Sequence, residues 1–347
     1  MALGFVVASD IANAVLIHYV RGKTLSQSTQ DKPLLRKLKA KQKFFAAGNL
    51  QISEPVQFSY MSDSPGFFVG FSEDDVIAFY QAQNILRATY PWRETSAGLG
   101  FTWTEMKKGG ITISNNNKTS THSQREAEIL TELMSNRMDD FNESWMRSVN
   151  LMLWKDGSQD AKQVPGLTSL IIDNPGLGTT GGISRTQYPL WQNFVNLNIG
   201  VSAENQTLSR TLRNQLRLLI QFGGKPNTVL CGSKFLESLE IEVQAKGYYT
   251  QTGFRKDEAV DVGMNKVRMM GLGEFEWDPT LDQLGYANRC YVYDDRRIQL
   301  MPMQGEENKV LTPERPYNYM VFFRNITWTG GLVLRQNNCN AIFAVNV

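Results

Sequence analysis

The stretch NPGLGTTGGISRTQYPLW, residues 174–191, raises the question on which the interpretation of this chain depends. Gly176, Gly178 and Gly181 within it match G-x-G-x-x-G, the loop that binds the pyrophosphate of a dinucleotide. A loop of this kind follows a strand and opens a helix, whose N-terminus points at the phosphates. The flanking sequence therefore decides between a cofactor site and glycines with a structural purpose.

The sequence on both sides of the loop favours the structural purpose. LTSLIID (167–173) could supply the strand, but ISRTQYPLWQN (183–193) contains Pro189 and has no helical apolar stripe. The glycines are then expected at a tight, irregular crossing, where the backbone passes close to another element. A nucleotide-binding enzyme that uses GLGTTG, residues 176–181, stays open as an alternative.

Composition and charge describe an ordinary globular protein. The 347 residues suffice for one large domain or two smaller ones, and 41% of them are hydrophobic and 20% charged. A net charge of +2 is too small to indicate nucleic-acid binding by the surface as a whole. Cys231, Cys290 and Cys339 form no C-x-x-C pair, which fits a reducing compartment. Polar residues interrupt the apolar N-terminus, so neither a signal peptide nor a membrane span is predicted.

Positive charge is concentrated near the N-terminus. Between residues 21 and 43 the chain has a single acidic residue, Asp31, and eight basic ones: Arg21, Lys23, Lys32, Arg36, Lys37, Lys39, Lys41 and Lys43. A segment with so little apolar material has little of its own to bury. We therefore expect it to lie across another part of the structure, either as a solvated basic helix or as a binding arm.

One long helix dominates the predicted secondary structure. THSQREAEILTELMSNRMDDFNESWMRSVNLMLW, residues 121–154, places apolar residues three or four positions apart along its length. This spacing predicts a helix over 123–153, roughly 45 Å long, with Ser123 and Glu126 as a capping box. Such a helix is much longer than is usual in globular domains, and we interpret it as the spine of its domain.

Other elements are expected on both sides of the long helix. Residues 50–113 read as strands and turns, in the manner of an extended β-loop. After the glycine-rich stretch an α/β segment is expected, with helices over 208–222 and 233–247 and a strand over 227–232. The last stretch, 318–347, is rich in strands.

Catalytic constellations are not apparent in the sequence. Its two histidines, His18 and His122, leave almost no material for a catalytic triad or a zinc site. We interpret Asp139 and Asp140 as the solvated face of the long helix, and Cys231 as a buried small hydrophobe. We therefore expect no enzyme activity, no cofactor and no metal.

The glycine-rich stretch also carries a resemblance to a known family. GLTSLI (166–171) and GTTGGISRTQYPLWQN (178–193) resemble the segment that follows the long helix in the major capsid proteins of tailed bacteriophages. The matching positions are Gly166, Leu167, Gly181, Gly182, Ile183, Arg185, Trp191 and Asn193. The commoner form of the motif has an aspartate after the isoleucine, where this chain has Ser184.

The resemblance implies an α+β chain with the Hong Kong 97-type fold. It covers most of the sequence and implies five parts, each with a place in that fold. They are an N-terminal arm (1–49), an extended β-loop region (50–115), a peripheral domain with the spine helix (116–190), an inserted α/β axial domain (191–294), and C-terminal strands that return to the peripheral domain (295–347).

The resemblance also implies a function in assembly. Members of the family self-assemble into hexamers and pentamers of an icosahedral head, which encloses double-stranded DNA without reading its sequence. Portal and scaffolding proteins, and for some members a decoration protein, would be the partners, and no membrane is involved. The protein would be a virion component assembled in the host bacterial cytoplasm. An encapsulin-type nanocompartment shell and a tail or decoration protein are the alternatives.

Two expectations about particular residues follow from the resemblance. A capsid crossover should need Gly181, Gly182, Arg185 and Trp191 more than it needs Gly176 and Gly178. The basic segment should either face the genome or dock on an acidic neighbouring subunit.

Overall fold

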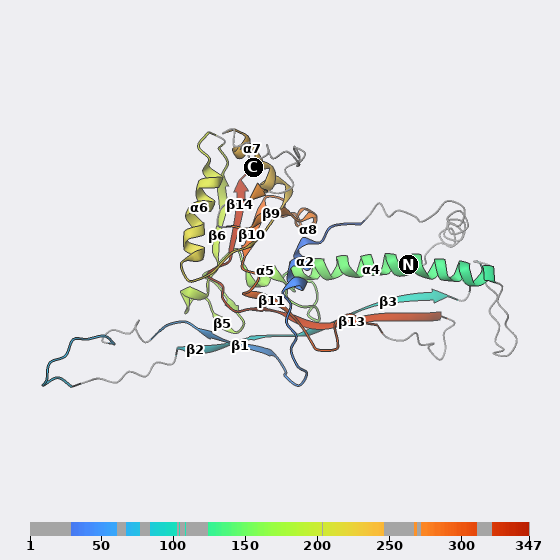
Figure 1. The fold of residues 1–347 in the computed structure, drawn as a ribbon, viewed down its shortest axis with the longest axis horizontal. Helices are drawn as coiled ribbons and strands as arrows, with labels where there is room; N and C mark the ends of the chain where they lie inside the picture. The colour runs from blue at the N-terminus through green and yellow to red at the C-terminus, as the bar shows by residue number, and fades with distance from the viewer. Residues whose placement is uncertain are drawn as a thin grey trace, which may run out of the picture. The chain divides into compact units, whose positions relative to one another are not determined.

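The computed structural model describes residues 29–60, 67–76, 84–102, 124–202, 204–245, 267–268, 272–310 and 321–346, with Thr104 and Lys108 (Figure 1). The chain divides into two compact units. The spine unit comprises Met1–Gln30, Glu94–Val149 and Gly305–Trp328. The sheet unit comprises Asp31–Arg93, Asn150–Gln304 and Thr329–Val347.

The long helix α4, Gln124–Trp154, confirms the helix predicted over 123–153. Its first part, up to Val149, belongs to the spine unit, where Phe141, Trp145 and Val149 are buried. Asp139 and Asp140 are exposed, as the apolar spacing predicted. The predicted capping box lies outside the described residues and side chains.

A small sheet completes the spine unit. Strand β3, Arg93–Thr102, pairs with β13, Val321–Leu334, and the two run side by side in Figure 1. Strand β12, Lys309–Val310, pairs antiparallel with β13 at Thr327 and Ile326. The approach of β3 to β13 is close, because a Cβ at Gly98 would lie 2.7 Å from the Asn325 side chain.

A six-stranded mixed sheet forms the centre of the sheet unit. Its order is β6-β14-β10-β7-β9-β8. The strands are β6 (Phe194–Gly200), β7 (Thr228–Cys231), β8 (Val267–Arg268), β9 (Glu274–Trp277), β10 (Arg289–Tyr293) and β14 (Ala341–Asn346). The segments predicted as a strand at 227–232 and as a strand-rich C-terminus are confirmed.

Strand β14 corrects one expected grouping. The sequence placed 295–347 with the peripheral domain, yet β14 lies between β6 and β10, both from the segment expected as the axial domain. It pairs parallel with β6, where Ala341 opposes Phe194, and antiparallel with β10, where Cys290 opposes Phe343. Long-range strand pairing of this kind leaves no local signal in the sequence.

Two helices pack on this sheet and confirm those predicted at 208–222 and 233–247. They are α6, Thr207–Ile220, and α7, Ser233–Ala245. Figure 1 shows α6 alongside β6. The core between helices and sheet includes Leu208, Leu212, Val229, Cys231, Phe235, Phe275, Val292 and Phe343, all of them buried. Cys231 is therefore the buried hydrophobe that the sequence predicted.

Helix α2, Pro33–Ala40, docks on its own chain. Leu34, Leu35 and Leu38 are buried, and the backbone N–H of Leu35 donates to Asn150 Oδ1 at 3.1 Å. After the helix, the N–H groups of Lys43 and Phe45 donate to carbonyls of β11, Ile298–Pro302, at 3.0 and 3.2 Å. This part of the expected arm thus belongs to the sheet unit of its own chain.

The remaining elements of the sheet unit include those of the segment from Gly166 to Asn193, which we call the crossover. β1, Ile52–Gln57, and β2, Ile85–Tyr90, form an antiparallel pair, and β11 pairs with the second half of β13. Between α4 and β6 come four short elements. These are α5 (Leu167–Leu170), β4 (Thr179–Thr180), β5 (Ile183–Ser184) and the 3-10 turn η2 (Pro189–Trp191), and α8 (Pro279–Gln283) follows β9. The strand suggested for 167–173 is thus a short helix.

Candidate functional site

Gly166 allows the chain to turn back on the end of α4. Its N–H donates to the Lys155 carbonyl at 2.8 Å, and a Cβ at this position would lie 2.3 Å from the Leu153 carbonyl oxygen. Leu167 beside it is fully buried, and the Thr168 hydroxyl donates to the Trp154 carbonyl at 2.8 Å. Only a residue without a side chain fits this contact between backbones.

Gly181 and Gly182 form the turn of the β4–β5 hairpin. Their φ angles are +60° and +77°, and the flanking Thr180 and Ile183 are paired. Two successive positive φ values belong to a type I′ turn, which favours glycine. The turn also contacts β2, because the Thr89 N–H donates to the Gly181 carbonyl at 2.9 Å. A Cβ at Gly181 would lie 2.9 Å from the Tyr90 ring.

The other two glycines of the G-x-G-x-x-G pattern have open space where a side chain would stand. A Cβ at Gly176 or Gly178 would meet nothing within 4 Å, although Gly178 has a φ of +78°. The loop is followed by the two-residue β5 and the turn η2, and α5 precedes it. The strand and helix that a dinucleotide loop requires are therefore missing around it.

Arg185 is the centre of the crossover. Its side chain is fully buried and donates three hydrogen bonds to neutral oxygens. Nε donates to Thr180 Oγ1 at 2.7 Å, Nη1 to Asn193 Oδ1 at 2.8 Å, and Nη2 to the Leu170 carbonyl at 2.6 Å. Burial lowers the pKa of Arg185 to about 10, so the guanidinium is still charged at neutral pH. One side chain thus joins α5, β4 and the start of β6.

Trp191 and Asn193 complete the same network. The indole N–H of Trp191 donates to the Thr180 carbonyl at 3.0 Å. The Asn193 amide donates to the Ile172 carbonyl at 2.9 Å, and the Ile172 N–H donates back to Asn193 Oδ1 at 3.3 Å. Aromatic contacts extend the cluster, because Phe58, just after β1, packs its ring 5.7 Å from that of Trp191. All eight residues that match the family motif lie in this one region of the sheet unit.

The contribution of Asn337 to this network was not predicted from the sequence. Its buried amide donates to the Trp191 carbonyl at 3.0 Å and to the Leu170 carbonyl at 3.4 Å. It thereby ties the turn before β14 to the crossover. The only signal available was the cluster QNNCN at 336–340, in which three asparagines stand beside an apolar strand.

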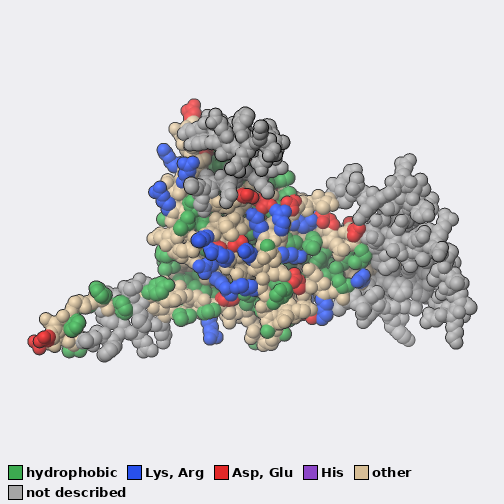
Figure 2. Space-filling view, viewed as in Figure 1, with side chains coloured by type: hydrophobic (Ala, Val, Ile, Leu, Met, Phe, Trp, Pro, Cys, Tyr) green, Lys and Arg blue, Asp and Glu red, His purple; other side chains and the backbone are tan. Residues whose placement is uncertain are grey.

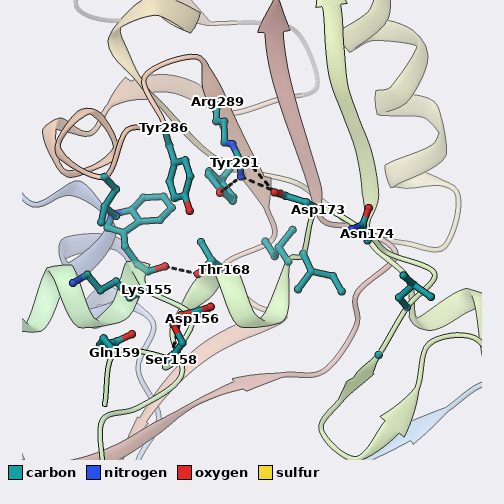
Figure 3. A pocket seen from close by; sticks show the side chains of 16 residues that line it. Lys155, Asp156, Ser158, Gln159, Thr168, Asp173, Asn174, Tyr286, Arg289 and Tyr291 are labelled. Atoms are coloured by element: carbon teal, nitrogen blue, oxygen red, sulfur yellow. Dashed lines mark hydrogen bonds and ion pairs between the residues drawn. The ribbon is translucent and has the colours of Figure 1, made fainter. Parts of the chain in front are cut away.

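An open pocket of about 690 Å³ lies beside the crossover, between the end of α4 and β10 (Figure 3). Arg289 stacks over the Tyr286 ring at 4.3 Å and donates to both carboxylate oxygens of Asp173, at 3.0 and 2.9 Å. Figure 3 shows these contacts and a third one to the Tyr291 hydroxyl. The cation is thus neutralised within the pocket, whose lining contains no histidine or cysteine.

The basic segment is partly committed to its own chain. Arg36 and Lys37 on α2 both form ion pairs with Glu276 of β9. Burial and the adjacent Arg36 lower the pKa of Lys37. Figure 2 shows basic and acidic side chains next to one another where Figure 1 draws α2. Lys32 and Lys39 are half-buried, Lys41 and Lys43 are exposed, and Arg21 and Lys23 lie outside the described residues.

The described parts of the chain contain neither a cluster of metal ligands nor a helix suited to cross a membrane. No group of three or more histidine, cysteine, aspartate or glutamate residues is placed to hold a metal ion. None of the described helices combines the length and apolar character that crossing a membrane requires.

Comparisons with known proteins identify the fold. No family model matches the sequence, and no curated protein matches it. Solved structures do match over nearly the whole chain. The capsid of cyanophage A-1(L) has a TM-score of 0.62 at 14% identity, covering 92% of this chain and 94% of its own. The capsid of a native GTA particle has a TM-score of 0.56 at 12% identity, covering 95% and 96%.

A third match comes from another group of phages. The capsid of Myoviridae phage XM1 has a TM-score of 0.53 at 9% identity, covering 93% of this chain and 95% of its own. Coverage above nine tenths in both directions means that the chain shares the whole fold and not a fragment of it. The chain therefore has the Hong Kong 97-type fold of tailed-phage capsid proteins.

Proposed function

We propose that this chain is the major capsid protein of a tailed phage and self-assembles into the hexamers and pentamers of an icosahedral head around double-stranded DNA. The fold shared with phage capsids over more than nine tenths of both chains supports this role. The crossover also supports it, because its buried residues hold backbone segments together, as a structural protein requires.

The observation that carries the proposal is the exposed apolar surface between β1 and β2. Residues 67–76 in this connection include Phe68, 97% exposed, and Phe71, 74% exposed, with Phe67, Val69 and Val76 also exposed. Several exposed large apolar side chains in one short segment favour a site of protein–protein contact. A chain that folds with these side chains in water completes their burial on another copy.

The finer parts of the proposal concern domains, partners and location. The division into arm, β-loop, peripheral domain and axial domain belongs to it, with β14 counted in the axial sheet. Portal and scaffolding proteins, and a decoration protein, are the proposed partners in the virion. Assembly is proposed to take place in the host bacterial cytoplasm.

Negative-stain microscopy of the expressed full chain tests the proposal. We expect closed shells or hexameric and pentameric rings, with a particle mass far above that of the 39.3 kDa subunit. A uniform monomer under every assembly condition would overturn it. Packaged genome, as opposed to an enzyme cargo, separates a phage head from an encapsulin-type shell. Titration with NAD and ATP tests the remaining alternative, since micromolar binding would indicate a nucleotide enzyme.

A further inference from the structure

Helix α6 presents a basic face at one edge of the six-stranded sheet. It packs on the edge strand β6 and contains no acidic residue. Arg210, Arg213 and Arg217 are exposed and lie three and four positions apart, so they share one face of the helix. Figure 2 shows blue side chains along the margin where Figure 1 draws α6.

These three arginines have no polar partner within the described parts of their own chain. Across the described ranges, none of the three side chains forms an ion pair or a hydrogen bond. Other arginines of the sheet unit do have acidic partners, as Arg289 has Asp173 and Arg335 has Glu54. The basic face of α6 is therefore available to another molecule.

An acidic face lies further along the same sheet. Helix α7 contacts β14, β10, β9 and α6 and carries Glu237, which is exposed, and Glu240, which is half-buried, with the exposed Lys234 three positions before Glu237. Partial burial and the nearby Glu237 raise the pKa of Glu240. Neither carboxylate forms an ion pair within the described residues. A guanidinium group brought between them would relieve their mutual repulsion.

Both faces also include exposed apolar side chains. On α6, Ile220 is 43% exposed and follows Arg213 and Arg217 by seven and three positions, which places it on their face. On α7, Ile241 is 47% exposed and follows Glu237 by four positions. Protein interfaces combine charged residues at the rim with apolar side chains between them. A nucleic-acid backbone would use the arginines but leave Ile220 in water.

We infer that the basic face of α6 on one copy of this chain docks on the acidic face of α7 on the next copy. The two faces are different surfaces of one subunit, so the contact is head-to-tail, and repeated rotation closes it into a ring. This inference rests on the proposed function and names the surfaces that would join neighbouring subunits within a hexamer or pentamer.

Charge reversal on each face tests the inference. Arg213→Glu/Arg217→Glu places like charges opposite each other in every contact, and we expect at least about tenfold fewer particles by sedimentation. Glu237→Arg/Glu240→Arg should cause a similar loss. The chain with all four changes restores opposite charges in every contact and should recover particle yield. Arg213→Lys/Arg217→Lys, which keeps the charge, and Lys162→Glu, an exposed change away from both helices, serve as controls.

The outcomes separate this interface from the proposed function. Circular dichroism and thermal melts of the unassembled subunits establish that each variant folds. Normal particle yield from either reversed variant, or no recovery in the fourfold variant, would overturn the interface alone. Reversed α6 variants that form particles normally but retain less DNA would assign the arginines to the genome and overturn it as well. An original chain that forms no particles would overturn the proposed function and the interface with it.

Discussion

The crossover and the β1–β2 connection belong to the same unit, but the key side chains of the first are buried and those of the second are exposed. At the crossover, the buried Arg185, Trp191 and Asn193 find all their partners within the chain. In the connection, Phe68 and Phe71 are 97% and 74% exposed. The comparison teaches that the first region is completed when the chain folds, whereas the second, under the proposed function, is completed on another copy of the chain. Substitutions in the two should therefore affect different measurements.

Arg185→Ala is the strongest way to break the crossover. It removes three donors at once and leaves Thr180 Oγ1, Asn193 Oδ1 and the Leu170 carbonyl buried without this partner. Hydrogen bonds from a charged group contribute about 1.5–3 kcal/mol each, so we expect the subunit to lose about 3 kcal/mol or more of unfolding free energy. Chemical denaturation of the unassembled subunit measures this loss.

Arg217→Ala provides the matched control. It removes the same side chain from an exposed position on α6, and we expect a change in unfolding free energy within about 0.5 kcal/mol. Equal effects of the two substitutions would mean that the network around Arg185 does not stabilise the fold.

Gly166→Ala and Gly176→Ala compare two glycines of the same stretch. A methyl group at Gly166 collides with the carbonyl oxygens of Leu153 and Lys155, at 2.3 and 2.5 Å. Overpacking of this kind costs about 1–3 kcal/mol, which a thermal melt detects as a lower midpoint. At Gly176 nothing lies within 4 Å, and no such loss is expected. A dinucleotide loop would reverse this order, since it depends on Gly176.

The double substitution Phe68→Ser/Phe71→Ser tests the exposed β1–β2 connection. Both side chains are exposed, so the unfolding free energy of the lone subunit should change by no more than about 0.5 kcal/mol. Particle yield should nevertheless fall, because the apolar contact with a neighbour is lost. Sedimentation measures the yield, and a drop in subunit stability with unchanged yield would contradict the division between the two regions.

The sequence predicted the elements whose signal is local. The apolar spacing from Phe141 to Val149 is enough to find α4, and the same rule finds α6 and α7. The absence of a helix after Gly181 was also predictable, because Pro189 and the β-branched and turn residues around it disfavour a helix. The fold class followed from the resemblance to tailed-phage capsid proteins, which rests on the glycine-rich stretch and on the order of the five parts along the chain.

Features that depend on distant partners were not predictable. The expected strand at 167–173 is the short helix α5, because Gly166 folds that segment back on α4. The partners of Arg185 include Leu170 and Asn193, and the role of Asn337 follows only from where β14 returns. Arg36 and Lys37 look like a free basic run in sequence, yet Glu276 lies beside them in space.

The position of β14 sets an order in the folding of the six-stranded sheet. Because β14 lies between β6 and β10, those two strands have no partner in common until residues 341–346 have left the ribosome. The sheet can therefore close only after that segment has been made, and until then β6 lacks the partner on this side and exposes an unpaired edge.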